Sequence, residues 1–187
     1  VYNRALSADE IKRLYKIGAT TKINTSISTD SLRNGLVGHW TFDGKDVAVN
    51  TAYDRSGQGN NGTLTNSPVR AIGKIGQALE FDGVDDYVNL GTPASLNLSV
   101  QNKFTLSAWI KLSSNPSGAG VITEMYSPTN ATVQYEIGFG LSDGTSNRLD
   151  VGFYDGVWRI SSDSVGSVPI GVWTQVTGVW DGTALIL

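Results

Sequence analysis

The chain of 187 residues contains no cysteine and a single histidine, His39. The missing thiol excludes disulfide bonds, thiolate metal sites and a cysteine nucleophile. A serine–histidine–aspartate triad would have to use His39. That residue lies between Gly38 and Trp40 in an alternating segment, where a structural or surface role is expected. The motifs HExxH, GxSxG and the P-loop are also missing, so we predict that the chain is not an enzyme.

Charge and long apolar runs are also scarce. Charged residues make up 17% of the chain and the net charge is −3, which gives no basic field for nucleic acid. No run of about 18 apolar residues is present, so we expect no membrane insertion. The chain opens on Val1 without a secretory signal sequence. We expect a piece of a longer protein, with flanking domains in the same parent chain.

Glycine, threonine, serine and asparagine are abundant, a composition typical of β-strands joined by turns. From residue 36 onward, apolar and polar residues alternate, as in FTLSAWIK at 104–111. Asp-Gly pairs at 155–156 and 181–182 predict two-residue hairpin turns. The pattern predicts an all-β, two-sheet antiparallel sandwich. The expected strands are 36–43, 77–82, 87–90, 104–112, 121–125, 133–139, 149–154, 157–161 and 172–180.

Residues 1–34 have a different pattern. Ser7 and Glu10 form a capping box, and apolar residues at helical spacing follow, so we predict a helix over residues 7–17. The stretch 19–34 is rich in threonine, serine and asparagine without a sustained period. We interpret it as a linker.

Several motifs follow one another at loop-and-strand spacing: GLVGHWTFDG at 35–44, DRSGQGNNGTL at 54–64, GQALEFDG at 76–83, VDDYV at 84–88 and FTLSAWIK at 104–111. This series resembles the opening half of a laminin G-like (concanavalin A-like) jelly-roll domain of bacterial secreted or surface proteins. The resemblance implies a jelly-roll sandwich that binds sugars or proteins. It also implies a tandem array, in which residues 1–18 are the closing strand and helix of a preceding similar repeat, 19–34 the linker and 35–187 a C-terminally incomplete domain. One hypothesis is that residues 1–17 fold onto the open sheet edge that this leaves.

Calcium is the cofactor that the acidic loops favour, in a structural role. Asp54, Ser56 and Gln58 alternate as oxygen ligands do at the start of a calcium loop, and a glycine follows. An ordinary polar turn held by side-chain hydrogen bonds explains the same pattern. Four further aspartates lie at the ends of expected strands that could be neighbours, and their carboxylates would repel one another without a cation. They are Asp43, Asp82, Asp85 and Asp86.

Ligand recognition would use aromatic side chains with polar neighbours. Tyr154 and Trp158 flank the 155–156 turn, with Asp150 and Arg159 nearby, so we predict a binding patch there. Ordinary hairpin packing is the alternative. Glu124 and Glu136 are the mid-strand glutamates, and neither belongs to the paired acidic cluster that a glycosidase carries on one strand.

We therefore expect a non-catalytic extracellular recognition module that binds carbohydrate or an extracellular protein partner. Two alternatives remain open. In the first, the chain is a structural spacer repeat of a surface adhesin. In the second, it is an accessory domain of a glycoside hydrolase whose catalytic residues lie in another domain. The location expected in each case is the cell surface or the extracellular medium.

Overall fold

The computed structural model describes residues 1–19, 31–98, 103–116, 119–126, 133–141, 148–154, 156–162 and 168–187. These residues form two compact units. Unit 1 comprises Val1 and Ala8–Ser95, and unit 2 comprises Tyr2–Ser7 and Leu96–Leu187. Within the described ranges, no helix is long and apolar enough to cross a membrane.

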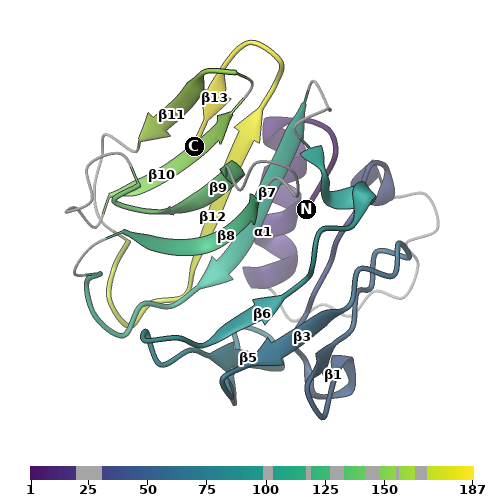
Figure 1. The fold of residues 1–187 in the computed structure, drawn as a ribbon, viewed down its shortest axis with the longest axis vertical. Helices are drawn as coiled ribbons and strands as arrows, with labels where there is room; N and C mark the ends of the chain where they lie inside the picture. The colour runs from purple at the N-terminus through teal and green to yellow at the C-terminus, as the bar shows by residue number, and fades with distance from the viewer. Residues whose placement is uncertain are drawn as a thin grey trace. The chain divides into compact units, whose positions relative to one another are not determined.

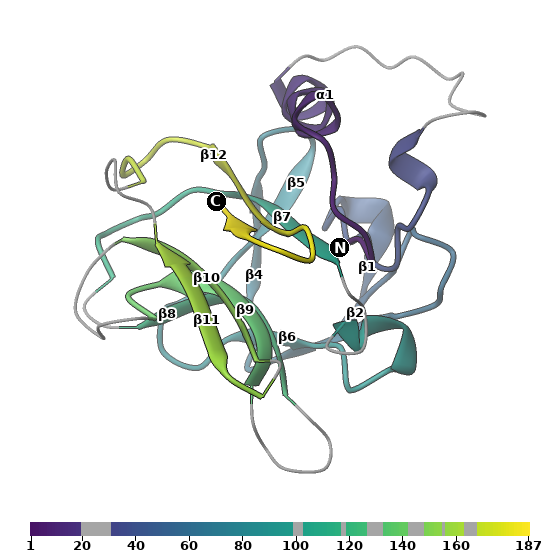
Figure 2. The same ribbon diagram turned by 90° about the horizontal axis from the view of Figure 1, so that it is seen from above.

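Unit 2 is a two-sheet antiparallel sandwich. One sheet has the strand order β11-β10-β9-β8 and the other β13-β12-β7. Figures 1 and 2 show β8–β11 as one layer, with β7, β12 and β13 forming the other. The predicted fold class is therefore confirmed. The strands are β7 (Phe104–Ile110), β8 (Gly120–Tyr126), β9 (Val133–Phe139), β10 (Leu149–Tyr154), β11 (Trp158–Ser162), β12 (Thr174–Trp180) and β13 (Leu185–Ile186).

Aromatic side chains from both sheets fill the core of unit 2. The Phe104 ring lies 5.8 Å from the Tyr135 ring and 5.7 Å from the Phe153 ring. Phe153 in turn lies 4.6 Å from Trp180. All four side chains are buried. These offset and edge contacts are the geometries that aromatic rings favour, so they join the two layers.

The N-terminal segment pairs with the sheet edge at β7. Tyr2 and Thr105 exchange two backbone hydrogen bonds, of 2.8 and 3.0 Å, in an antiparallel bridge. Strand β7 pairs with β12 along its other side. The start of the chain therefore contacts a sheet edge at Tyr2. The folding-back hypothesis for residues 1–17 stays a prediction.

Unit 1 contains the helix and six short strands. The sheet order is β1-β2-β3-β6, and β4 pairs with β5 as a separate hairpin. The elements are α1 (Ala8–Ala19), the 3-10 helices η1 (Ser31–Arg33), η2 (Gly44–Asp46) and η3 (Ala94–Leu96, whose last residue belongs to unit 2), and the strands β1 (Val47–Ala48), β2 (Thr51–Ala52), β3 (Gly62–Thr65), β4 (Val69–Ile72), β5 (Gln77–Glu80) and β6 (Tyr87–Asn89).

The predicted strand at 36–43 is wrong, because the chain there is irregular. Phe42 has a φ of 55°, a left-handed conformation that interrupts an extended strand. The Trp40 ring folds back over Gly38, where an added Cβ would lie 2.3 Å from the ring. The indole N–H of Trp40 donates to the carbonyl of Asn60 at 2.8 Å. Local side-chain packing therefore overrides the alternating pattern.

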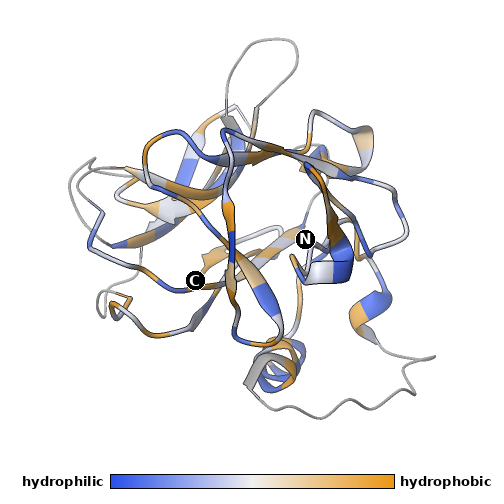
Figure 3. Ribbon diagram, turned by 90° about the horizontal axis from the view of Figure 1, so that it is seen from below, coloured by the Kyte–Doolittle hydropathy of each residue, from blue (hydrophilic) through white to orange (hydrophobic). Residues whose placement is uncertain are grey.

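Helix α1 begins one residue after the predicted start and ends two residues beyond the predicted end. Hydrophobic and hydrophilic residues both occur along its turns (Figure 3). Tyr15 and Ile17, two of its apolar residues, are 54% and 52% exposed. Of the predicted linker, residues 20–30 lie outside the described part. The division into an earlier repeat, a linker and a domain stays a prediction.

The turn after β10 also differs from its prediction. Tyr154 pairs with Trp158, so the loop between the strands has three residues instead of two. Gly156 within it has a φ of 108°, which glycine adopts without strain. Asp155 lies outside the described residues.

Candidate functional site

The β8–β11 sheet has one face in the core and one face turned away from it. Tyr135, Ile137, Val151 and Phe153 are buried and alternate with residues that point to the opposite side. The strand register then assembles those alternate residues side by side. We call this surface the outer face; it comprises Glu124, Gln134, Glu136, Gly138, Asp150, Gly152, Tyr154, Trp158, Ile160 and Ser162.

An aromatic pair occupies one end of the outer face. Tyr154 on β10 is the register partner of Trp158 on β11, and their ring centroids are 5.8 Å apart at an interplanar angle of 58°. Trp158 is 42% exposed, and Ile160 next along the face is 41% exposed. Part of the Trp158 ring is therefore accessible on this face, whereas the rings of Phe104, Tyr135, Phe153 and Trp180 are buried in the core.

Two glutamates occupy neighbouring strands of the same face. Glu124 on β8 and Glu136 on β9 are direct cross-strand partners. Partial burial raises the pKa of the Glu124 carboxyl above its ordinary value. Burial also raises the pKa of Glu136, and the nearby charges of Glu124 and Asp150 add to that shift. The two glutamates belong to different strands, as the sequence predicts, but the sequence pattern does not predict their pairing across β8 and β9.

Gly152 lies next to Glu136 on the outer face. It is the register partner of Glu136 on β9 and of Ile160 on β11. A Cβ built at Gly152 would lie 3.5 Å from Oε1 of Glu136. The carboxylate of Glu136 therefore lies against a position without a side chain.

The predicted binding patch is only partly brought together. Tyr154 and Trp158 are in contact, and Asp150 shares their face as the register partner of Gly138, fully buried. Arg159 alternates to the other side of β11, where its guanidinium lies 5.8 Å from the centroid of the Trp180 ring. The outer face therefore contains three of the four residues, and their ligand role stays a prediction.

Protein donors surround the carboxylate of Asp54 in the first predicted calcium loop. Its Oδ1 accepts the backbone N–H groups of His39 and Ser56, at 2.9 and 2.8 Å. Its Oδ2 accepts the Ser56 hydroxyl at 2.7 Å and the Asn60 N–H at 3.0 Å. Burial opposes ionisation, but these bonds lower the pKa of Asp54 overall. Gln58 is exposed, and its backbone N–H donates to Ser56 Oγ at 3.2 Å. The geometry is that of a turn closed by its own hydrogen bonds.

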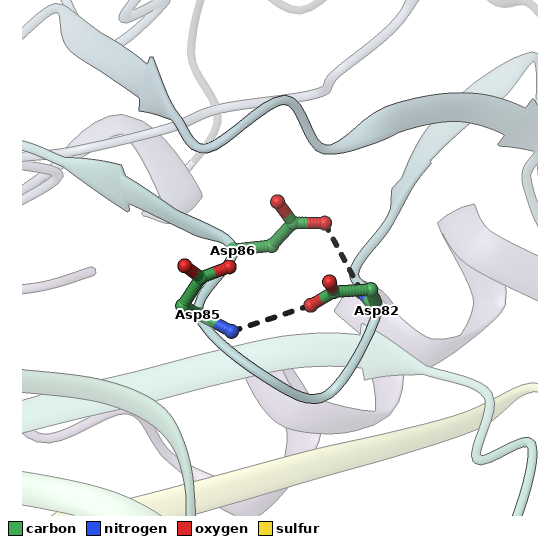
Figure 4. Close-up of side chains that lie close together, drawn as sticks. All are labelled: Asp82, Asp85 and Asp86. Carbon is green, nitrogen blue, oxygen red and sulfur yellow. Dashed lines mark hydrogen bonds between the residues drawn. The ribbon is translucent and has the colours of Figure 1, made fainter.

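The second predicted acidic cluster is partly assembled. Asp82, Asp85 and Asp86 each offer a carboxylate oxygen within 4.8 Å of the other two (Figure 4). The Asp82 carboxylate accepts the N–H groups of Val84 and Asp85, and these bonds lower its pKa. Asp43 is not part of this group among the described residues. Its Oδ1 caps η2 through the Gly44 N–H at 3.0 Å and accepts the Gln77 N–H at 3.2 Å. Calcium binding stays a prediction.

A family model described as the concanavalin A-like lectin/glucanases superfamily, laminin G-like branch, matches residues 82–187. The chain belongs to this superfamily. The match covers more than half of the laminin G-like chain and includes every strand of the unit 2 sandwich. No curated protein and no solved structure shows significant similarity to it.

In this laminin G-like chain, the Glu124–Glu136 pair is the feature that sequence reasoning missed. The alternating pattern places each glutamate on the side opposite the core residues of its strand. Their partnership depends on the β8–β9 register, which shifts between Val121 and Thr123 and again between Met125 and Tyr126. An irregular register of this kind has no signal in the spacing of residues along the chain.

Proposed function

We propose that the outer face of the unit 2 sandwich binds carbohydrate, and that the chain acts as an extracellular recognition module beside other domains of its parent protein. The observation that carries the proposal is the accessible Tyr154–Trp158 pair on the same face as the Glu124–Glu136 pair. Membership in a superfamily that includes lectins supports the same ligand class. Detection of the parent protein on the cell surface or in the culture medium tests the location.

The chemistry of the face suits a sugar. A pyranose ring presents an apolar C–H face, which the exposed ring of Trp158 can cover. Its hydroxyl groups donate hydrogen bonds, and the carboxylates of Glu136 and Glu124 accept them. Gly152, which lies between Glu136 and Ile160 in the register, adds no side chain to this part of the face.

Affinity electrophoresis in gels that contain soluble polysaccharides tests the proposal. We expect at least one polysaccharide to retard the wild-type chain, and Trp158→Ala to lose most of that retardation. Tyr87→Ala is the matched control, because Tyr87 is 48% exposed on β6 of unit 1. Equal retardation of both variants contradicts a site on the outer face. Absence of retardation by a broad polysaccharide panel favours the spacer alternative.

Glycoside hydrolysis is a second candidate, and the direct pairing of Glu124 with Glu136 favours it. Cross-strand partners have Cβ atoms about 4.5–5.5 Å apart. Retaining glycosidases place their two carboxyl groups about 5–5.5 Å apart, and one of them needs a raised pKa to act as the acid. The raised pKa of Glu136 meets that second condition.

Release of reducing sugar from each bound polysaccharide separates the two candidates. Hydrolysis that both Glu124→Gln and Glu136→Gln abolish supports the enzyme. Binding without release of sugar supports a recognition module. In that case Glu124→Gln and Glu136→Gln change only the affinity for the polysaccharide.

A further inference from the structure

Residues 2–6 lie against the edge of β7 and are bonded to it at Thr105. Tyr2 and Thr105 exchange both backbone hydrogen bonds. The Thr105 hydroxyl accepts the Leu6 N–H at 3.0 Å and donates to the Arg4 carbonyl at 2.8 Å. Beside the single backbone bridge at Tyr2, the Thr105 side chain therefore satisfies two further backbone groups of the segment, which bends around it.

Two apolar side chains anchor the segment. Tyr2 and Leu6 are each 5% exposed, and Thr105 between them is fully buried. The intervening residues 3–5 are half-buried. The segment is therefore held at its two ends by buried apolar side chains, with a bend at residues 3–4 between them.

The segment packs with a part of the chain that is remote in sequence. Tyr2–Ser7 belongs to unit 2 with Leu96–Leu187, whereas the intervening Ala8–Ser95 belongs to unit 1. Its contacts therefore depend on the complementarity of the edge and the segment, and not on closeness along the chain. A free segment of the same sequence would make the same hydrogen bonds and fill the same two apolar positions.

We propose that the outer edge of β7 is a peptide-acceptor site, and that a second copy of this chain can fill it with its own residues 2–6. Binding would use the two main-chain bonds between Tyr2 and Thr105, the two bonds to the Thr105 hydroxyl, and the buried side chains of Tyr2 and Leu6 for specificity. Reciprocal exchange between two copies would give a two-fold symmetric dimer. The proposed sugar site lies on the β8–β11 sheet and does not use this edge. The peptide-acceptor proposal and the sugar-binding proposal can therefore fail independently.

The test uses the full chain with Leu6→Asp, which disables the resident segment, and a fluorescent synthetic peptide of residues 1–10. We expect saturable binding of the wild-type peptide by fluorescence anisotropy, together with an increase in the Tm of the host chain. The same peptide with Leu6→Asp should not bind. A peptide with Asp9→Asn is the matched control and should bind as wild type, because the Asp9 side chain is 93% exposed.

The acceptor side is tested by adding Thr105→Val to the host. Valine keeps the shape but removes the hydroxyl that bonds Leu6 and Arg4, so we expect affinity to fall about tenfold. If the Leu6→Asp host is unfolded alone, recovery of a cooperative melt on addition of wild-type peptide supports the site. Absence of both binding and Tm recovery overturns it, as does equal binding of the Leu6→Asp peptide.

Sedimentation at high concentration tests the identity of the occupant. The wild-type chain, in which every copy has a competent segment and a competent edge, should form a species of twice the mass by reciprocal exchange. The Leu6→Asp chain should not form it. A wild-type chain that sediments only as single copies at every concentration, although the peptide binds, overturns the assignment to a second copy.

Discussion

Asp46 is a buried carboxylate whose partners hold it ionised. The residue is 2% exposed. Its Oδ1 accepts hydrogen bonds from two nitrogens of Arg55, Nε at 2.8 Å and Nη2. Its Oδ2 accepts the hydroxyl of Thr41. The bonds to Arg55, followed by the bond to Thr41, outweigh burial and lower the pKa of Asp46. This group therefore fixes the turn at η2.

We expect Asp46→Asn to lower the free energy of unfolding by about 1–3 kcal/mol, because Arg55 and Thr41 lose the charged acceptor that the buried Asp46 provides. Urea denaturation at neutral pH measures the loss. Folding lowers the pKa of Asp46. The stability that its ionised carboxylate contributes is therefore fully present above the ordinary pKa of 3.8 and is lost as the pH falls through the folded-state pKa. Asp85→Asn, at an exposed position, is the control and should change little. Equal losses in both variants would contradict a specific role for Asp46.

Glu136 gives the opposite pH dependence. Its folded-state pKa is raised above the ordinary 4.5, so the native state holds a proton more tightly than the unfolded chain. Stability due to this group is fully present below pH 4.5 and falls as pH rises through the folded-state pKa. We expect Glu136→Gln to raise the Tm at pH 7 and to leave it unchanged near pH 4. A Tm that Glu136→Gln lowers at both pH values would show a structural role for the carboxylate.

Among the elements of unit 2, strands β12 and β10 of the two sheets approach each other closely. A Cβ at Gly178 on β12 would lie 2.5 Å from Cγ2 of Val151 on β10. Both residues are buried, so the side chain has little room to move. The absence of a side chain at Gly178 therefore sets the local spacing of the two sheets.

Gly178→Ala should lower the free energy of unfolding by about 1–3 kcal/mol, the usual cost of overpacking a core. Gly120→Ala on β8 is the control, because the nearest atom to its Cβ would be 3.7 Å away, an ordinary contact. Chemical denaturation of both variants measures the difference. Equal stability of Gly178→Ala and wild type would mean that the sheets can separate without cost.

Strands with strong alternation were predictable from sequence, and short or locally interrupted ones were not. Strands β9 and β10 have the predicted bounds, because apolar residues alternate along their whole length. Strands β1 and β2 have two residues each, too few to show a period. The Tyr154–Trp158 pair followed from one hairpin, whereas the Glu124–Glu136 pair depends on a shifted register. Local pattern therefore predicts elements and adjacent contacts better than the chemistry of a face built from several strands.

Calcium binding would act on the stability of the whole molecule. Asp82, Asp85 and Asp86 lie within reach of one ion, and binding to the folded state alone adds RT ln(1 + [L]/Kd). At calcium about 100 times Kd the gain is roughly 2.7 kcal/mol. We expect the Tm to be higher in calcium than in EDTA, and the difference to vanish in Asp82→Asn. Identical melts in calcium and EDTA would make the cluster an ordinary acidic turn.

The central claim for the whole molecule is that a laminin G-like sandwich binds sugar on the outer face of its β8–β11 sheet. Five tryptophans give the chain five indole N–H signals, one of which reports directly from that face. The most direct measurement is therefore a proton–nitrogen NMR titration of the full chain with a polysaccharide fragment that it binds. We predict that the indole signal of Trp158 shifts progressively, while that of Trp40, bonded to the Asn60 carbonyl in unit 1, stays in place. A shift of Trp40 with Trp158 unmoved would contradict the account.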